Sequence, residues 1–132
     1  MVQNSDSPSD AAYGDNLDLG TMDQLLSLDD GELGLLEEML CLYREDTPDR
    51  IKAIEHTLGA GEMVDMADVA HAIKGAASTM GAPRVRVVAA ALETGGRLGK
   101  FDTEPKVLLE RLKVAYQDSL DAMDAFVASR KS

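Results

Sequence analysis

The chain has 132 residues, which suits one domain with one hydrophobic core. Aromatic residues make up only 4% of it, so good helix formers supply most of the apolar material and few strand-favouring runs remain. We therefore expect an all-α fold. The formal net charge of -11 repels phosphate backbones and anionic lipid head groups, so neither nucleic acid nor a membrane is expected as a partner.

The chain shows no signal for export or membrane insertion. Its apolar runs are too short to cross a bilayer, and residues 1–16 lack the basic and apolar regions of a secretory signal. Cys41 is the only cysteine, so no internal disulfide is possible. These features predict a cytoplasmic protein, which we expect to be a monomer.

The first twenty residues differ in composition from the rest. Residues 1–20 are rich in Ser, Asp, Asn and Gly and show no apolar period, which predicts a flexible leader before a domain over residues 21–132. The stretch "TMDQLLSL" then predicts a short helix with Thr21 as its N-cap.

Longer helices follow in chain order. Apolar residues recur at spacings of three and four. This periodicity predicts helices over 31–45, 47–59, 62–80, 84–100 and 103–129. Because the connections are short, sequential helices should run antiparallel. The expected architecture is an antiparallel up-down four-helix bundle with an additional short N-terminal helix.

Several residues mark the expected helix ends. Thr47 followed by Pro48 is typical of an N-cap and first helical position, so we expect a new helix to begin there. Gly81 should end the helix over 62–80. The Gly95-Gly96 pair weakens the next helix without having to break it.

The stretch "AHAIKGAASTMGA", residues 70–82, carries the main functional signal. His71, Lys74, Gly75 and Ser78 share one helix face, away from the apolar stripe. A neutral imidazole is a good nucleophile near pH 7, and Lys74 can neutralise part of a phosphoryl anion. Gly75 costs about 1 kcal/mol of helix stability relative to Ala, which makes sense if another protein approaches this face closely.

Other chemistries fit the sequence less well. Two distant histidines and one cysteine make a poor zinc site, and no glycine-rich nucleotide motif is present. A Ser–His–Asp triad stays open, although no nucleophile-elbow pattern marks a serine. His56 has no second ligand or nucleophile at helical spacing and is interpreted as a surface histidine. A helical histidine beside a lysine can also be an ordinary surface pair, and small residues can serve helix packing.

Charge is unevenly distributed along the chain. From His71 to Lys100 there are five basic residues and one acidic residue, Glu93, a net charge of +4. A basic region on an acidic protein suits a docking site for an acidic pocket or a bound phosphate.

The residues just described resemble a known signature. "AHAIKGAASTMGA" is similar to the motif of histidine-containing phosphotransfer (HPt) domains, Ala-His-x-Leu-Lys-Gly-x-[Ser/Ala]-x-x-x-Gly-Ala, with Ile73 in place of the usual Leu. "LLEEMLCLYREDTPDRIKAI" resembles the helix pair that precedes the motif, and "LETGGRLG" resembles the stretch that follows it. The resemblance covers about residues 21 to 128.

The resemblance implies a function and a set of site residues. His71 would be the phosphoacceptor, Lys74 would contact the phosphoryl group, and Gly75 would give a partner access. Arg97 and Glu93 lie where the neighbouring helix of similar proteins faces the histidine. Some members have Gln at the position of Glu93. Because a carboxylate repels a phosphoryl group, its role stays open, with an i, i+4 pair to Arg97 as one alternative.

The expected partners follow from the same resemblance. They are a response-regulator receiver domain, a hybrid histidine kinase, or both, with the protein acting as a phosphocarrier that has no ATP-dependent kinase activity. The chain would need no cofactor or metal of its own, and Mg²⁺ would be on the receiver. Two alternatives remain: a helix-turn-helix DNA-binding protein, from "VAHAIKGAASTMGAPRVRVVAAALE", and a helical adaptor without chemistry.

Overall fold

The computed structural model describes residues 13–131, and every regular element in this range is helical. A 3₁₀ turn, η2 (Gly14–Asn16), precedes the helices. These are α2 (Leu19–Leu28), α3 (Gly34–Gly59), α4 (Met63–Met80), α5 (Pro83–Leu98) and α6 (Pro105–Lys131). The expectation of an all-α fold is confirmed for the described residues.

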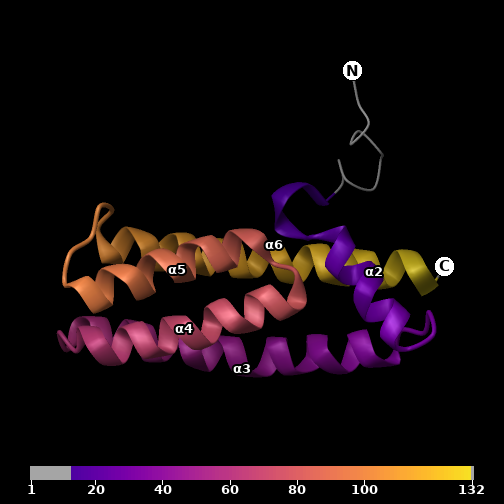
Figure 1. Ribbon diagram of the computed structural model, residues 1–132, viewed down its shortest axis with the longest axis horizontal. Helices are drawn as coiled ribbons and strands as arrows, with labels where there is room; N and C mark the ends of the chain where they lie inside the picture. Colours follow the sequence, from indigo (N-terminus) through magenta and orange to yellow (C-terminus); the bar gives the residue numbers. More distant parts are fainter. Residues whose placement is uncertain (1–12, 132) are drawn as a thin grey trace, which may run out of the picture.

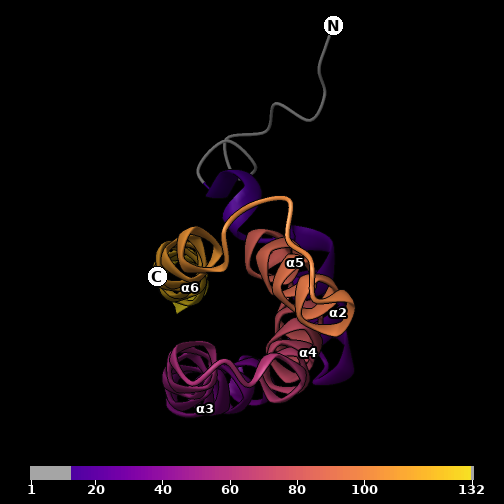
Figure 2. The ribbon, with the colours of Figure 1, turned by 90° about the vertical axis from the view of Figure 1, so that its left-hand side faces the viewer.

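The four long helices lie along a common direction, and α2 lies across one end of them (Figure 1). Seen end-on, they surround a shared interior (Figure 2): α4 packs between α3 and α5, and α6 contacts both α5 and α3. The largest fully buried side chains in this interior are Met22, Leu36, Ile54, Met66, Ile73, Leu92, Leu112 and Met123. Among residues 13–131, no helix has both the length and the apolar content needed to cross a membrane.

The expected helix break at Thr47 and Pro48 is wrong, because α3 continues through both residues. Pro48 has no N–H, so the carbonyl of Arg44, four residues earlier, loses its normal helical donor. The hydroxyl of Tyr116 on α6 donates to that carbonyl at 3.4 Å and to the carbonyl of Tyr43 at 3.2 Å. A tertiary hydrogen bond therefore replaces the missing one, and the segments over 31–45 and 47–59 form one helix.

The start of α2 also differs from expectation. Asp18, not Thr21, caps this helix, since its side chain accepts a hydrogen bond from the N–H of Gly20 at 3.0 Å. Thr21 instead donates its hydroxyl proton to Asp18. The predicted short N-terminal helix itself is present.

Residues 13–20 were expected in a flexible leader but pack against the helices. Leu17 is buried, the ring of Tyr13 lies edge-on to Phe126 at 6.1 Å, and the N–H of Asp18 donates to the carbonyl of Gly81 at 2.8 Å. The boundary predicted at residue 20 is therefore too late. Residues 1–12 lie outside the described residues, so the leader stays a prediction there.

The turn between α4 and α5 fixes the site helices relative to each other. Gly81 ends α4 as predicted, with φ 70°, a left-handed conformation that favours glycine. The α5 helix continues through Gly95 and Gly96, as predicted. A Cβ atom at Gly96 would lie 2.8 Å from the carbonyl oxygen of Met63. The close approach of α4 and α5 therefore requires a residue without a side chain there.

Candidate functional site

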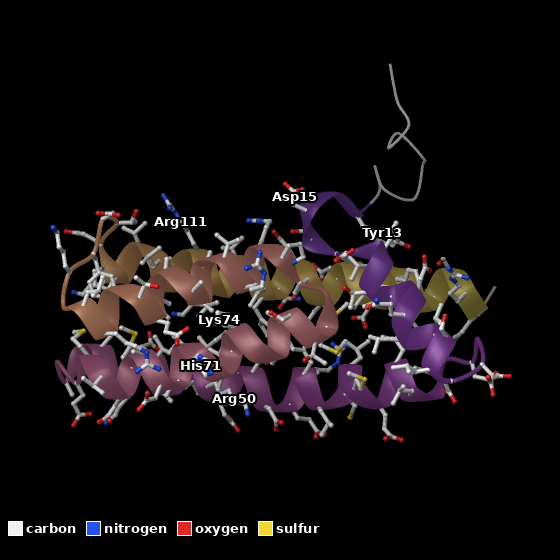
Figure 3. All side chains as sticks on the ribbon, in the orientation of Figure 1. Tyr13, Asp15, Arg50, His71, Lys74 and Arg111 are labelled. Carbon is white, nitrogen blue, oxygen red and sulfur yellow. The ribbon has the colours of Figure 1, made fainter. Side chains whose placement is uncertain are left out.

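His71 projects from the surface midway along α4 (Figure 3). Ala70 and Ile73 on the same helix are fully buried, so the intervening turn directs position 71 outward. The His71 side chain is 63% exposed. An imidazole in this position is accessible to a large reaction partner.

The carboxylate of Glu93 on α5 connects the basic groups around His71. Its Oε2 lies 2.8 Å from Nδ1 of His71, and its Oε1 lies 2.7 Å from Nζ of Lys74. The expected i, i+4 pair with Arg97 is also present, with Nη2 3.3 Å from Oε2. Arg97 reaches back to Asp68 on α4 at 3.1 Å. We call these five residues the Glu93 cluster.

The surroundings of Glu93 keep its carboxylate ionised. The hydrogen bond from Lys74 is the main cause that lowers the pKa of Glu93 to about 2, and the hydrogen bond to His71 lowers it further. Burial acts in the opposite direction but is outweighed. Because only 12% of its side chain is exposed, Glu93 is a nearly enclosed anion held by three basic side chains.

The contact with Glu93 determines the reactive nitrogen of His71. A carboxylate accepts but does not donate, so the proton of a neutral imidazole lies on Nδ1, where it donates to Oε2. The lone pair is then on Nε2. Among residues 13–131 no hydrogen bond to Nε2 is present. The site therefore presents an available nucleophilic nitrogen on an exposed ring.

Gly75 lies one turn beyond His71 on an open surface. A Cβ atom built there would meet no atom within 4 Å outside its own local backbone, in contrast to the clash at Gly96. Internal packing therefore gives no reason for a glycine at position 75. The alternative that this small residue serves helix packing is not supported by the geometry.

Ser78 belongs to a different part of the surface. It lines a hollow together with Asp18, Thr21 and Arg86, where α2 meets the turn between α4 and α5. It makes no hydrogen bond or ion pair with the Glu93 cluster in the described chain. Of the expected site residues, His71, Lys74, Glu93 and Arg97 are brought together, with Gly75 open beside them, while Ser78 is not.

The positive charge of the region between His71 and Lys100 is partly neutralised within the fold. Lys74 and Arg97 bind Glu93, and Arg84 pairs with Asp118 on α6 at 3.1 Å. Arg97 also pairs with Asp68, so two acidic residues from outside the region compensate about half of its net charge of +4. In the part of the chain that the structure describes, no cluster of three or more His, Cys, Asp or Glu side chains is arranged to hold a metal ion.

The resemblance placed Glu93 and Arg97 on the helix that faces the histidine, but it did not predict the direct contacts of Glu93 with His71 and Lys74, which join different helices. A signal for the first was present: His71 lies eleven residues before Ala82 in the turn, and Glu93 lies eleven residues after it. Residues equally distant from a tight turn face each other in an antiparallel helix pair. A nearly equal spacing, fourteen residues before Ala82 and fifteen after it, places Asp68 near Arg97.

Comparison with known proteins agrees with this geometry. A family model described as Hpt domain matches residues 38–126, which include all of α4 and α5 and most of α3 and α6. The chain therefore belongs to the Hpt domain family. Membership implies histidine phosphotransfer in phosphorelay signalling, in which these domains interact with receiver domains and histidine kinases. No curated protein matches the chain.

Proposed function

We propose that this chain is a phosphotransfer protein whose phosphoacceptor is Nε2 of His71. It takes a phosphoryl group from the aspartate of a receiver domain or from a hybrid histidine kinase, and passes it to another receiver. The observation that carries the proposal is the exposed imidazole whose Nδ1 is engaged by Glu93, because this leaves Nε2 as the nucleophile. The antiparallel up-down four-helix bundle serves as its rigid support.

The neighbouring residues have separate roles in the proposal. Lys74 contacts the phosphoryl group, and its ammonium has three protons, so it can bind a phosphoryl oxygen while keeping Glu93. Gly75 leaves room for the receiver to approach. Arg97 compensates the charge of Glu93. Ser78, which lies apart from the Glu93 cluster, is proposed as a docking contact only.

The partner supplies what this chain lacks. Phosphoryl transfer needs positioning of the reacting groups and neutralisation of charge. On the partner's side, Mg²⁺ in the receiver would neutralise this charge. The chain is a phosphocarrier without ATP-dependent kinase activity, acting in the cytoplasm as a monomer with no cofactor of its own. Nothing in the described residues favours the helix-turn-helix alternative, since α4 and α5 lie side by side and Arg84 is bound to Asp118.

Incubation with a phosphorylated receiver domain tests the proposal. Label should appear on this chain, be labile in acid and stable in base, and be absent from His71→Gln. The matched control is His56→Gln, which removes the other histidine, exposed on α3. Transfer to wild type and His56→Gln, but not to His71→Gln, is expected. A folded wild-type chain that accepts no label from any receiver would indicate a helical adaptor instead.

A further inference from the structure

A surface groove follows the seam between α5 and α6, and η2 contacts both helices there (Figure 2). Arg84 in this groove precedes Glu93 by nine residues, or about two and a half helical turns, so the two side chains leave opposite sides of α5. A protein bound in the groove would therefore leave His71 uncovered. The groove is lined by Asp15, Pro83, Arg84, Val87, Val88 and Arg111.

Apolar side chains are exposed along this seam. Val87 on α5 and Val114 on α6 are each more than half exposed. Arg84 pairs with Asp118 across the seam at 3.1 Å. One helical turn farther along the antiparallel pair, Val88 therefore lies level with Val114. Exposed apolar residues that gather in this way are typical of an interaction surface.

A charged residue without a partner lies at each end of these valines. Asp15 in η2 and Arg111 on α6 are both exposed, and within residues 13–131 neither makes an ion pair or a hydrogen bond. Their side chains project from the same side of the molecule (Figure 3). The groove thus offers one anion and one cation to an incoming protein.

The separation of these two charges is about two helical turns. Asn16, next to Asp15, accepts a hydrogen bond from Arg84, which lies level with Asp118. Arg111 precedes Asp118 by seven residues, about 10 Å along α6. Positions i, i+3, i+4 and i+7 of a helix share one face. A helix laid along the groove can therefore reach both charges and cover the valines between them.

We propose that this groove binds one amphipathic helix of a partner protein, with a carboxylate on Arg111, a basic side chain on Asp15 and apolar residues against the valines between them. A groove between two packed helices accepts the apolar face of a third in the same way that helices pack within a fold. The inference goes beyond the proposed phosphotransfer function. It gives the chain a second docking surface that can be occupied while His71 faces a receiver.

Charge favours a partner helix over two other occupants of the groove. Residues 1–12 contain two aspartates but no Lys or Arg, so they offer no basic side chain to Asp15. A second copy of the chain carries the same net charge of -11 and is repelled. A helix of another protein that carries one acidic and one basic residue matches both ends of the groove.

The test uses the full chain, labelled with ¹³C in the valine methyl groups, and three synthetic peptides held helical by an internal cross-link. Every peptide has Leu at positions i+3 and i+4. The charged residues at positions i and i+7 are Glu and Lys in the first peptide, two Glu in the second and two Lys in the third. Binding is followed by NMR titration, and circular dichroism verifies that each protein variant is folded.

In wild type, we expect the Glu/Lys peptide to shift the methyl signals of Val87, Val88 and Val114. Val64 on α4 is 63% exposed but lies outside the groove, so its signal should not move. The Glu/Lys peptide should bind about fivefold more tightly than the other two, because each of those places one charge against a like charge.

Reversal of either charge in the groove should change which peptide binds best. Arg111→Glu should prefer the Lys/Lys peptide, and Asp15→Lys should prefer the Glu/Glu peptide. The matched control is Lys52→Glu, which reverses an exposed cation on α3 and should keep the wild-type preference.

The inference would be overturned if millimolar Glu/Lys peptide left the groove valines unshifted, or if both groove variants ranked the peptides as wild type does. Without peptide, a shift of the same signals on deletion of residues 1–12 would assign the groove to the chain's own N-terminal segment. A shift on dilution would assign it to a second copy. Either result would also overturn the inference. No step involves phosphoryl transfer, so these outcomes leave the proposed function unaffected.

Discussion

At the scale of single residues, the structural reasons for glycine at positions 75 and 96 are opposite, although both residues lie inside helices. A side chain at 75 would meet open space, so Gly75→Ala should stabilise the protein by about 0.4–1 kcal/mol. Gly96→Ala should destabilise it, because its Cβ would clash with the backbone of α4. Thermal melting of both variants measures this contrast.

The size of the side chain at position 75 should control the access of a receiver domain to His71. Gly75→Leu should retain the fold but lose transfer, because a long side chain on the open face would obstruct the receiver. Transfer from a phosphorylated receiver, measured beside Gly75→Ala, tests this expectation. Transfer at the wild-type rate by Gly75→Leu would show that the receiver does not approach over this turn.

The lowered pKa of Glu93 should make the stability of the folded protein in acid depend on this residue. Its pKa is lowered to about 2 from an ordinary 4.5, mainly by Lys74, so its contribution to stability is fully present above about pH 4.5. The contribution should be lost as pH falls through about 2. Glu93→Gln should therefore melt below wild type at pH 7, and this difference should shrink between pH 4.5 and pH 2. A difference in melting temperature that does not change with pH would contradict the lowered pKa of Glu93.

At the scale of helices, α3 shows what local signals can miss. Apolar spacing correctly indicated helix on both sides of Pro48, and Thr47-Pro48 is a genuine helix-start pattern. The helix continues because a hydroxyl from Tyr116, 68 positions later in the chain, satisfies the carbonyl groups near the proline. No pattern within α3 contains that information.

A double-mutant cycle tests this explanation. Tyr116→Phe should cost about 1–3 kcal/mol, because it leaves the partly buried carbonyl of Arg44 without a donor. In Pro48→Ala, residue 48 regains an N–H that can donate to the carbonyl of Arg44. The same Tyr116→Phe change should then cost at least about 0.5 kcal/mol less. Equal costs in both backgrounds, measured by denaturant unfolding, would exclude the compensation.

At the scale of the whole molecule, the segment before α2 belongs to the fold. Leu17 is 4% exposed, so Leu17→Ala should cost about 2–4 kcal/mol in denaturant unfolding. The matched control is Leu28→Ala at the end of α2, where the side chain is 75% exposed and the expected change is below about 0.5 kcal/mol. Equal effects would mean that the N-terminal segment does not pack as described.

The composition gave no indication of this packing. Residues 13–20 are mostly polar or glycine, and Leu17 does not belong to a run of apolar residues at helical spacing. The helix carrying His71 was predictable throughout, since its apolar stripe is regular and its motif is dense. Predicting the Glu93 cluster would have required knowing how α4 packs against α5. That packing depends on the turn at Gly81 and on the close approach of the two helices at Gly96. Residue type and spacing within one helix could indicate the nucleophile but not the carboxylate that orients it.

The most direct test of the central claim is to identify the phosphorylated atom. After incubation with a phosphorylated receiver, NMR of ¹⁵N-histidine-labelled protein should show phosphorus coupled to Nε2 of His71, with the proton on Nδ1. His56 should remain unmodified. Phosphorus on Nδ1 of His71, on His56 or on any other residue would contradict the assignment of Nε2 as the nucleophile and of Glu93 as the group that leaves it available.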